Sequence, residues 1–288
     1  MTPPDRVHVK AHAKFNPMLR VLAKETSGYH GIETVFALLE LSDELTVERS
    51  EGGVELDVSG ADTGPTEENL AYRAAQAVIR GTGNTFGVRI RLDKAIPMQA
   101  GLGGGSSDAA ATLHAVNQLA PRPLPKQELL QLATQLGSDV AFFVSAARLA
   151  VGWNRGERLF QLRPPPPAPC LIAIPPARVS TPEAYQLLDR VQDFETRRAT
   201  IVLDAEAFET WGSIARLGGN DFENIVFGKE PVVRTLFEQV AMTTPLLVRM
   251  TGSGSAIVAV YRREEDLEDA VSNLGTRDKT LIKTRTMP

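Results

Sequence analysis

The sequence of 288 residues holds a single cysteine, Cys170. A disulfide within the chain is therefore excluded, which fits the reducing conditions of the cytoplasm, and we expect a cytoplasmic protein. A lone cysteine is most often a small buried apolar residue. Cys170 is accordingly expected to pack in a core and not to act as a nucleophile.

Long apolar runs and a large excess of one charge are missing as well. No segment approaches the roughly 18 apolar residues of a membrane-spanning helix, and residues 1–16 have no apolar stretch of signal-peptide length. The net charge is −4, so nothing draws the whole chain toward nucleic acid or an anionic membrane. We therefore expect no nucleic-acid partner, no membrane partner, small-molecule substrates held by local groups, and a monomer or homodimer.

Alternation of apolar and polar residues predicts several short strands. Segment 34–41 is apolar enough for a buried strand or a short helix, and Gly52-Gly53, between two alternating segments, indicates a hairpin. The predicted strands are 7–11, 15–21, 44–48, 54–58, 88–92, 170–174, 246–250 and 256–261.

Apolar residues at helical spacing predict helices between these strands. Clusters of antiparallel strands with helices between them favour an α+β fold over a doubly wound α/β fold. Four prolines at 164–167 predict an exposed, extended connector, and we place a domain boundary there, with one domain over 1–160 and a second over 161–288. The predicted helices are 67–80, 108–119, 126–136, 182–191, 232–240 and 266–274.

A glycine-rich segment lies between the strand that ends near Leu92 and the helix that follows Ser107. A helix N-terminus presents unpaired N–H groups and a partial positive charge, which suit phosphate, and glycines let the backbone approach a ligand closely. We therefore expect this segment to wrap the phosphates of ATP. It consists of Pro97, Met98, Gln99, Ala100, Gly101, Leu102, Gly103, Gly104, Gly105, Ser106 and Ser107.

Two common phosphate-binding loops are excluded by the residues present. A Walker A loop ends in Gly-Lys-Ser/Thr, and this segment has no lysine. The dinucleotide pattern G-x-G-x-x-G would need a glycine where Ser106 stands. A flexible turn without a ligand is a further alternative, but four glycines between strong elements are costly in conformational entropy.

The glycine-rich segment resembles the second motif of the GHMP kinases, the family that holds galactokinase, homoserine kinase and mevalonate kinase. Two further segments resemble motifs of that family: AKFN at 13–16 its A-K-x-N motif, and MTGSGSA at 250–256 its C-terminal glycine motif. The resemblance implies a two-domain GHMP kinase fold with antiparallel sheets, an N-terminal ATP-binding domain and a C-terminal substrate-binding domain.

One branch of the family fits better than the others. Its members use ATP to phosphorylate the 2-hydroxyl of 4-(cytidine 5′-diphospho)-2-C-methyl-D-erythritol, in the non-mevalonate route to isopentenyl diphosphate. The ordered matches run from about residue 11 to about residue 261. They are GLGGGSSDAAATL at 101–113, GYH at 28–30, the acidic pair at 43–44, LGSDVAFF at 136–143, VST and AY within 179–185, and NDFE at 220–223.

Some positions depart from that branch. Ser27 and Gly31 stand where Asp and Glu are usual, and Pro17 follows Asn16 where leucine is common. A glycine pair is replaced within 145–147, which reads Ser-Ala-Ala. None of these departures removes a group assigned to the chemistry, so they bear on loop shape and substrate affinity.

The resemblance implies a catalytic pair. Asp139 matches the catalytic aspartate of the family, the natural base for a tertiary alcohol, and such proton transfer contributes about 10²–10⁴-fold. Lys14 matches the catalytic lysine, whose charge would keep Asp139 ionised. Without the family match, Asp139 would be interpreted as an ordinary helix-end carboxylate and Lys14 as a solvated lysine at a strand end.

The resemblance also implies binding residues. Tyr29 would stack on the cytosine, His30 would read its edge, and Tyr185 would close the other face, where stacking is worth about 1–3 kcal/mol per base. Asn16 lies two residues after Lys14, on the same side of a strand, and would bind substrate or a phosphate oxygen. The further substrate contacts implied are Thr181, Gly252 and Gly254.

At the nucleotide, Asn69 lies where the family contacts the adenine. Mg²⁺ is expected because ATP phosphates need charge neutralisation, and Ser107 is the best protein contact for it.

Three rival interpretations remain open. Another GHMP kinase, acting on homoserine, mevalonate or a sugar, would share the glycine-rich segment but would not need Gly28-Tyr29-His30. A non-catalytic nucleotide-binding protein on the same fold would be favoured by loss of Lys14 or Asp139, and both are present. An unrelated binding module is the third.

Overall fold

The structure, a computed structural model, describes residues 3–25, 28–191 and 204–288. The chain forms two compact units. Neither unit is one continuous stretch, because two long N-terminal strands contribute to both. The first unit holds Met1–Ala13, Leu41–Met98 and Gly103–Ala147, and the second holds Lys14–Glu40, Gln99–Leu102 and Arg148–Pro288. The domain boundary between 160 and 161 stays a prediction.

The two N-terminal strands are longer than the sequence pattern predicts. Strand β1 is Arg6–Lys24, β2 is His30–Ser50, and the two pair with each other. The expectation of two separate strands in each region was wrong, because buried polar residues interrupt the apolar pattern without interrupting the strand. Lys14, between the two strands predicted for the β1 region, is 3% exposed, and Asp43 in β2 is 0% exposed. Segment 34–41 is strand and not helix.

In the first unit the strand order is β3-β4-β2, where β3 is Val54–Ser59 and β4 is Gly87–Asp93. The predicted hairpin at Gly52-Gly53 is wrong, because β4 lies between β2 and β3. The chain leaves β3, forms helix α1 (Leu70–Gly81) and returns as β4 parallel to β3. Gly87 permits this crossing, since a Cβ there would lie 2.3 Å from the backbone carbon of Gly52.

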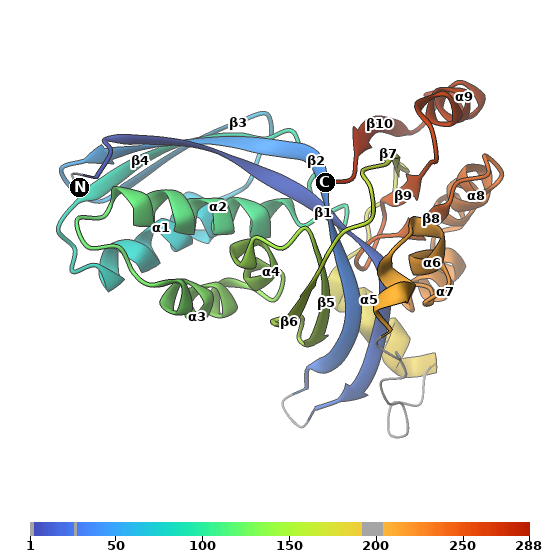
Figure 1. Ribbon diagram of the computed structural model, residues 1–288, viewed down its shortest axis with the longest axis horizontal. Coiled ribbons are helices and arrows are strands. Elements are labelled where there is room, and N and C mark those ends of the chain that lie inside the picture. The colour runs from blue at the N-terminus through green and yellow to red at the C-terminus, as the bar shows by residue number, and fades with distance from the viewer. Residues whose placement is uncertain (1–2, 26–27, 192–203) are drawn as a thin grey trace. The chain divides into compact units, whose positions relative to one another are not determined.

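Helices cover one face of these strands. Along β4 the side chains of Ile90 and Leu92 are buried, while Arg89 and Arg91 are exposed. Helices α1, α2 (Gly104–Leu119) and α3 (Lys126–Leu136) lie on one side of the strands in Figure 1. The short helix α4 (Val140–Ser145), which the sequence pattern did not predict, packs against α2 and α3. This helical layer carries the C-terminal part of the glycine-rich segment.

In the described part of the second unit, strands β5 to β10 pair in antiparallel fashion. Strand β5 (Leu149–Asn154) pairs with the N-terminal half of β2 and with β6 (Arg158–Leu162). A four-stranded sheet has the order β10-β7-β9-β8, with all pairs antiparallel. Its strands are β7 (Pro169–Ile174), β8 (Leu247–Met250), β9 (Ile257–Val260) and β10 (Thr280–Arg285). The α+β class is confirmed, whereas β5, β6 and β10 were not predicted.

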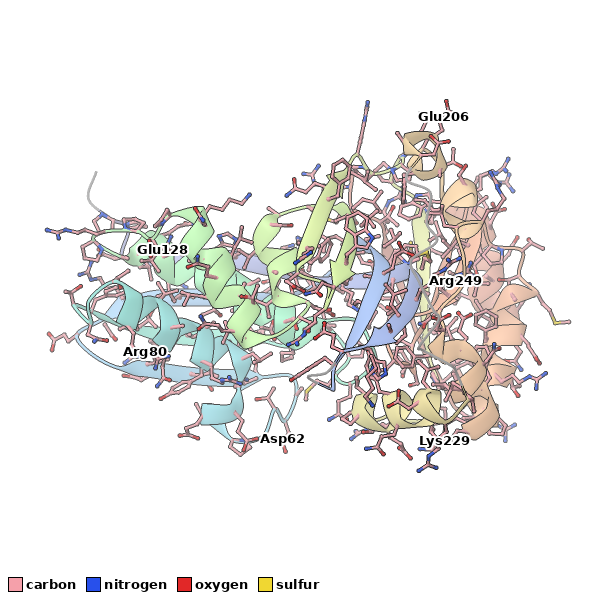
Figure 2. The ribbon with its side chains drawn as sticks, turned by 90° about the horizontal axis from the view of Figure 1, so that it is seen from below. Asp62, Arg80, Glu128, Glu206, Lys229 and Arg249 are labelled. Atoms are coloured by element: carbon pink, nitrogen blue, oxygen red, sulfur yellow. The ribbon has the colours of Figure 1, made fainter. Side chains whose placement is uncertain are left out.

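Helices α8 (Pro231–Ala241) and α9 (Glu264–Leu274) lie beside this sheet (Figure 1). Their buried residues share one apolar cluster with those of the strands, and helices α5 (Thr181–Val191) and α7 (Phe222–Lys229) contribute to it. Lys229 of α7 pairs with Glu183 of α5 at 2.5 Å, near the edge of the unit seen in Figure 2. The remaining short elements are η1 (Thr66–Glu68), η2 (Ala205–Phe208) and α6 (Trp211–Ala215).

Two predictions from composition can be checked here. Cys170 is fully buried in β7, and burial raises the pKa of its thiol, which confirms that it packs as a small core residue. The proline connector is exposed only at Pro166 and Pro167, while Pro165 is buried and Pro169 opens β7. Within the described part of the chain, no helix combines the length and the apolar character needed to cross a bilayer.

Candidate active site

The glycine-rich segment crosses the C-terminal glycine turn with backbone packed on backbone, inside the second unit. Gly101 has φ +81°, and a Cβ at this residue would lie 2.1 Å from the carbonyl oxygen of Thr251. Gly252 has φ +58°, and a Cβ there would lie 3.1 Å from the Cα of Gly101. Ala256 N–H donates to the carbonyl of Ala100 at 3.2 Å. Two motifs 150 residues apart in sequence therefore need glycine to pass each other.

Helix α2 begins at Gly104, four residues before the predicted start at 108. Gly103 is its N-cap with φ +73°, and the first helical hydrogen bond runs from Ser107 N–H to the Gly103 carbonyl at 2.9 Å. The N–H groups of Gly104, Gly105 and Ser106 therefore have no partner within the helix, as in every helical first turn. The end of the glycine-rich segment is thus itself a helix N-terminus, which favours bound phosphate.

Lys14 is a buried lysine in the middle of β1. Its residue is 3% exposed, and Nζ donates to Oδ1 of Asn16 at 2.6 Å and lies 5.8 Å from the ring centre of Phe36. The backbone N–H of Lys14 donates to the carbonyl of Leu102 in the glycine-rich segment at 2.9 Å. The prediction that Lys14 and Asn16 share one side of a strand is confirmed, and the alternative of a solvated lysine is wrong.

Asn16 connects Lys14 to the glycine turn. Its Oδ1 also accepts from the N–H of Gly252 at 3.1 Å, and its Nδ2 donates to Thr34 Oγ1 at 2.9 Å. Its own backbone N–H donates to Thr251 Oγ1 at 3.1 Å. Every polar group of this side chain is used within the protein, so Asn16 holds the Lys14 ammonium in place relative to the turn.

The NDFE motif has a structural role that the sequence did not reveal. Asn220 Nδ2 donates to the carbonyls of Met250 and Gly252, both at 2.7 Å. Glu223 Oε1 accepts from Met250 N–H at 3.0 Å, and burial raises the pKa of this carboxyl. Asp221 Oδ2 accepts from the N–H of Val21 in β1 at 2.7 Å. The motif therefore fixes the C-terminal glycine turn and β1 in one framework.

Arg249, labelled in Figure 2, reinforces the same region. Its Nε donates to the carbonyl of Pro17 at 3.1 Å, and its Nη2 donates to the carbonyls of Ala215, at 2.7 Å, and Gly218. The carbonyl of Pro17, a residue that departs from the family pattern, thus accepts a hydrogen bond, although proline has no backbone N–H to donate.

Asp139 is half-buried at the N-cap of α4, in the first unit. Its side chain makes no capping hydrogen bond to the helix, so the carboxylate is not consumed by α4. Helix α4 packs against α2, the helix that begins with the glycine-rich segment.

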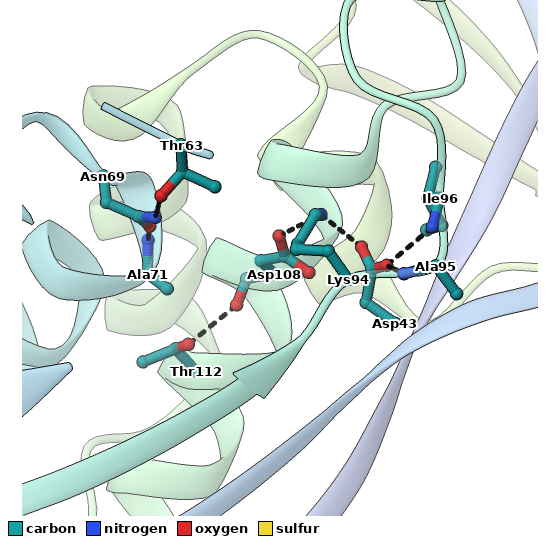
Figure 3. A network of polar contacts seen from close by, with 9 residues as sticks. All are labelled: Asp43, Thr63, Asn69, Ala71, Lys94, Ala95, Ile96, Asp108 and Thr112. Atoms are coloured by element: carbon teal, nitrogen blue, oxygen red, sulfur yellow. Dashed lines mark hydrogen bonds and ion pairs between the residues drawn. The ribbon is translucent and has the colours of Figure 1, made fainter. Parts of the chain in front are cut away.

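Asn69 is the N-cap of α1, so the helix begins at Leu70 and not at the predicted residue 67. Its Oδ1 accepts from Ala71 N–H at 2.9 Å and its Nδ2 donates to Thr63 Oγ1 at 3.2 Å (Figure 3). In the structure Asn69 caps α1. Its contact to the adenine stays a prediction.

A buried lysine with two carboxylates lies next to the start of α2 (Figure 3). Lys94 Nζ donates to Asp108 Oδ2 at 2.6 Å and to Asp43 Oδ2. Burial raises the pKa of Asp108 to about 7; Asp43 adds to this shift, and Lys94 opposes it. The sequence predicts no function for these three residues.

A second cluster surrounds His30 at the start of β2. Its Nε2 lies 2.6 Å from Asp189 Oδ1, and its ring stacks on Tyr185 with centres 5.2 Å apart. Lys24 Nζ donates to Asp189 Oδ2 at 2.5 Å. Partial burial disfavours the charged carboxylate, but hydrogen bonds and charge from Lys24 and His30 outweigh it and hold the pKa of Asp189 below its usual value. The structure therefore brings His30 and Tyr185 together and adds Asp189. That His30 and Tyr185 bind the cytosine stays a prediction.

Tyr29 is 59% exposed, and the guanidinium of Arg155 lies 4.0 Å from its ring centre. Arg155 also pairs with Glu25 at 2.9 Å. One face of the Tyr29 ring is therefore occupied by a cation, and a stacked base would use the other. Ser27, one of the departures from the family pattern, lies outside the described residues.

Thr181 begins α5, and its Oγ1 lies 2.7 Å from Oγ of Ser253 in the glycine turn. Gly254 in the same turn has φ +100°, and a Cβ there would lie 3.0 Å from Sδ of Met250. Thr181, Gly252 and Gly254 are thus neighbours in the second unit. No group of three or more His, Cys, Asp or Glu side chains that suits a metal ion occurs among the described residues.

Comparison with known proteins agrees with this geometry. Residues 69–147 match the model of the GHMP kinases N terminal domain, and residues 202–279 match that of the GHMP kinases C terminal domain. The 4-diphosphocytidyl-2-C-methyl-D-erythritol kinase of Chloroherpeton thalassium is 37% identical over 259 residues, 89% of this chain and 90% of the relative. The enzyme of the same name from Pelotomaculum thermopropionicum is 37% identical and covers 96% of both chains.

Solved structures give the same result. A crystal structure of 4-(cytidine 5′-diphospho)-2C-methyl-D-erythritol kinase is similar with a TM-score of 0.82 and 32% identity, over 98% of this chain and 100% of the other. The mevalonate kinase of Methanococcus jannaschii has a TM-score of 0.71 at 13% identity, over 98% and 99% of the two chains. The mevalonate kinase shares the fold alone.

Proposed function

Since the chain belongs to the 4-diphosphocytidyl-2-C-methyl-D-erythritol kinases, a branch of the GHMP kinases, we propose that it transfers the γ-phosphoryl group of ATP to the 2-hydroxyl of 4-(cytidine 5′-diphospho)-2-C-methyl-D-erythritol. The products are the 2-phosphate and ADP. This reaction belongs to the methylerythritol phosphate route to isoprenoids, which the sequence resemblance had indicated.

The observation that carries this proposal is the position of Lys14. A buried ammonium is costly unless it is hydrogen-bonded, and here Asn16 holds it at 2.6 Å. The same Asn16 binds the backbone of Gly252, which in turn packs on Gly101. The lysine of the A-K-x-N motif is therefore anchored to the crossing of the two glycine motifs, as a phosphoryl-transfer site requires of a fixed cation.

Asp139 and Lys14 divide the chemistry between them. Asp139 takes the proton of the attacking 2-hydroxyl, the role of the family's catalytic aspartate that it matches. Lys14 stabilises the negative charge that develops during transfer, and Asn16 acts through Lys14 as a positioning residue.

ATP is held by its phosphates. The N–H groups of Gly104, Gly105 and Ser106 at the start of α2 bind the phosphate oxygens, together with the backbone of the segment that precedes them. The Ser107 hydroxyl in the first turn of α2 is the protein group that would hold Mg²⁺, which would neutralise part of the charge of the nucleotide. Asn69 contacts the adenine.

Residues of the second unit bind the cytidine end of the substrate. His30, held by Asp189 and stacked on Tyr185, binds the edge of the cytosine, and the exposed face of Tyr29 stacks on the base. Thr181, Gly252 and Gly254 contact the methylerythritol and diphosphate part. The division into an N-terminal ATP-binding and a C-terminal substrate-binding domain, the cytoplasmic location, and the monomer or homodimer remain predictions.

An ADP-release assay tests the function. The purified full chain is offered ATP with 4-(cytidine 5′-diphospho)-2-C-methyl-D-erythritol, and in parallel with mevalonate, homoserine or galactose. We expect turnover with the cytidine substrate alone. Turnover with one of the other three alone would replace the assignment by another GHMP kinase activity. ATP binding without any turnover would favour a nucleotide-binding protein.

A further inference from the structure

The lysine and two carboxylates beside α2 are more buried than their charges alone would favour. The side chains of Lys94, Asp43 and Asp108 are 3%, 0% and 5% exposed. One ammonium faces two carboxyl groups, and Oδ1 of Asp108 has no hydrogen-bond partner among the described residues. Burying such a group costs several kcal/mol per ion before pairing, so a buried ion pair is a weak source of stability.

The three side chains connect the two ends of the glycine-rich segment. Asp43 Oδ1 accepts from the N–H groups of Ala95 and Ile96, at 2.6 and 2.7 Å, directly before the segment begins. Asp108 lies on α2 directly after Ser107, the last residue of the segment. Lys94 bridges both carboxylates, so a single cation fixes the entry of the segment to the helix that follows it (Figure 3).

Lys94 also lies directly against the first residue of α2. A Cβ placed on Gly104 would be 3.3 Å from Nζ of Lys94 and 3.1 Å from Cγ2 of Ile96. The backbone of Gly104 therefore packs against Lys94 and against Ile96, whose N–H donates to Asp43. A shift of Lys94 would move the N–H groups of the first helical turn.

We propose that Lys94, with Asp43 and Asp108, is a positioning residue that preorganises the glycine-rich segment for the ATP phosphates. The proposal rests on the ATP-binding function given above and adds three residues that do not touch the nucleotide. Preorganisation lowers the entropy lost when a loop closes on a ligand, so its removal weakens binding of the phosphates in particular. Adenosine, which has no phosphates, is bound independently of it.

Direct binding measurements on the full chain test this. Calorimetric titration with MgATP and, separately, with adenosine is performed on the wild type and on Lys94→Met. We expect Lys94→Met to bind MgATP at least about 10-fold more weakly, with adenosine affinity unchanged. In turnover, KM for ATP rises while KM for the cytidine substrate stays the same.

Arg49→Met is the matched control. Arg49 is a cation of the first unit that packs 5.2 Å from the ring centre of Phe86 and donates to the carbonyl of Leu119, away from the glycine-rich segment. It should leave both affinities unchanged. An equal loss of MgATP affinity in Arg49→Met, or a parallel loss of adenosine affinity in Lys94→Met, overturns the proposal, because either shows a general loss of structure.

A second variant keeps the test decisive if Lys94→Met does not fold. Asp108→Asn keeps the size of the side chain and leaves the ion pair of Lys94 with Asp43. We expect this variant to bind MgATP about 3-fold or more weakly than the wild type. In the double variant, the loss should not exceed that of Lys94→Met alone, because the two residues act through one contact. Wild-type MgATP affinity in Asp108→Asn overturns the positioning role. If the wild type itself fails to bind MgATP, the proposed function fails and this proposal fails with it.

Discussion

Nζ of Lys14 donates a 2.6 Å hydrogen bond to Oδ1 of Asn16, and that same oxygen accepts from the N–H of Gly252, 236 residues away in sequence. The side chain of Asn16 is thus a single acceptor shared by the proposed catalytic cation and the C-terminal glycine turn. Through this sharing, the A-K-x-N motif and the distant glycine motif each fix the position of the other.

The first prediction concerns Asn16→Ala. It removes the acceptor of Lys14 and of Gly252 N–H, so the ammonium loses its fixed position and kcat should fall by about 10²-fold, as for the loss of one preorganised charge contact. Steady-state kinetics with both substrates measures this. Thr34→Val is the control, because it removes only the Oγ1 that accepts from Asn16 Nδ2 and leaves the contact to Lys14. A similar kcat loss in both variants would show that general destabilisation is the cause.

The second prediction concerns Asp139→Asn. The amide has the shape of the carboxylate but does not accept the proton of the 2-hydroxyl, so kcat should fall by at least about 10²-fold. MgATP affinity, measured by titration, should be unchanged, because Asp139 is not assigned to the nucleotide. Turnover at the wild-type rate would falsify the role of Asp139 as the base.

The third prediction concerns Gly101→Ala. The residue has φ +81°, and the added Cβ would lie 2.1 Å from the carbonyl oxygen of Thr251, a backbone atom with little freedom to move. Positive φ costs an alanine about 1–2 kcal/mol, and the clash adds about 1–3 kcal/mol. We expect the free energy of unfolding to fall by about 2–5 kcal/mol in urea denaturation.

Gly53→Ala separates the two contributions. Gly53 has φ +73°, and a Cβ there meets nothing within 4 Å. The free energy of unfolding of Gly53→Ala should therefore fall only by the cost of the positive φ, about 1–2 kcal/mol. Equal losses at both positions would mean that the close crossing of Gly101 and Thr251 does not contribute.

The fourth prediction concerns pH. The pKa of Asp108 is about 7 in the folded protein, against an ordinary value of 3.8, chiefly because of burial. Between these values the folded chain holds a proton that the unfolded chain releases. Asp108 therefore contributes stability that is fully present below pH about 4 and is lost as the pH rises through about 7, with an upper limit on the order of 4 kcal/mol.

Urea denaturation of the wild type at pH 5, 6, 7 and 8 should show this decline. Asp108→Asn has no proton to release, so its free energy of unfolding should vary less with pH over the same range. Identical pH profiles for the two proteins would assign the decline to other groups.

The fifth prediction concerns Asp189→Asn. Asp189 holds His30 through a 2.6 Å contact and carries the charge that fixes its orientation, and a hydrogen bond to a charged group is worth about 1.5–3 kcal/mol. KM for the cytidine substrate should rise about 10-fold or more, while KM for ATP stays the same. Glu183→Gln on the same helix, which removes an exposed ion pair to Lys229, should change neither value.

The sequence by itself determined the glycine-rich segment, its place before a helix, and the α+β class. These follow from local rules: alternation in strands such as β4, helical spacing in α3 and α8, and the chain order of the motifs. The buried position of Cys170 also followed from residue type alone.

Only the tertiary structure decided which distant residues support the site. Gly101 and Gly252 belong to two motifs far apart in sequence, and it is their close crossing that requires glycine. Lys94 and Asp189 had no local pattern, because an ion pair with a residue far away in sequence, here Asp43 or His30, produces no pattern in either segment. The same reason hid the continuity of β2, whose buried Asp43 is satisfied by partners that the sequence does not place beside it.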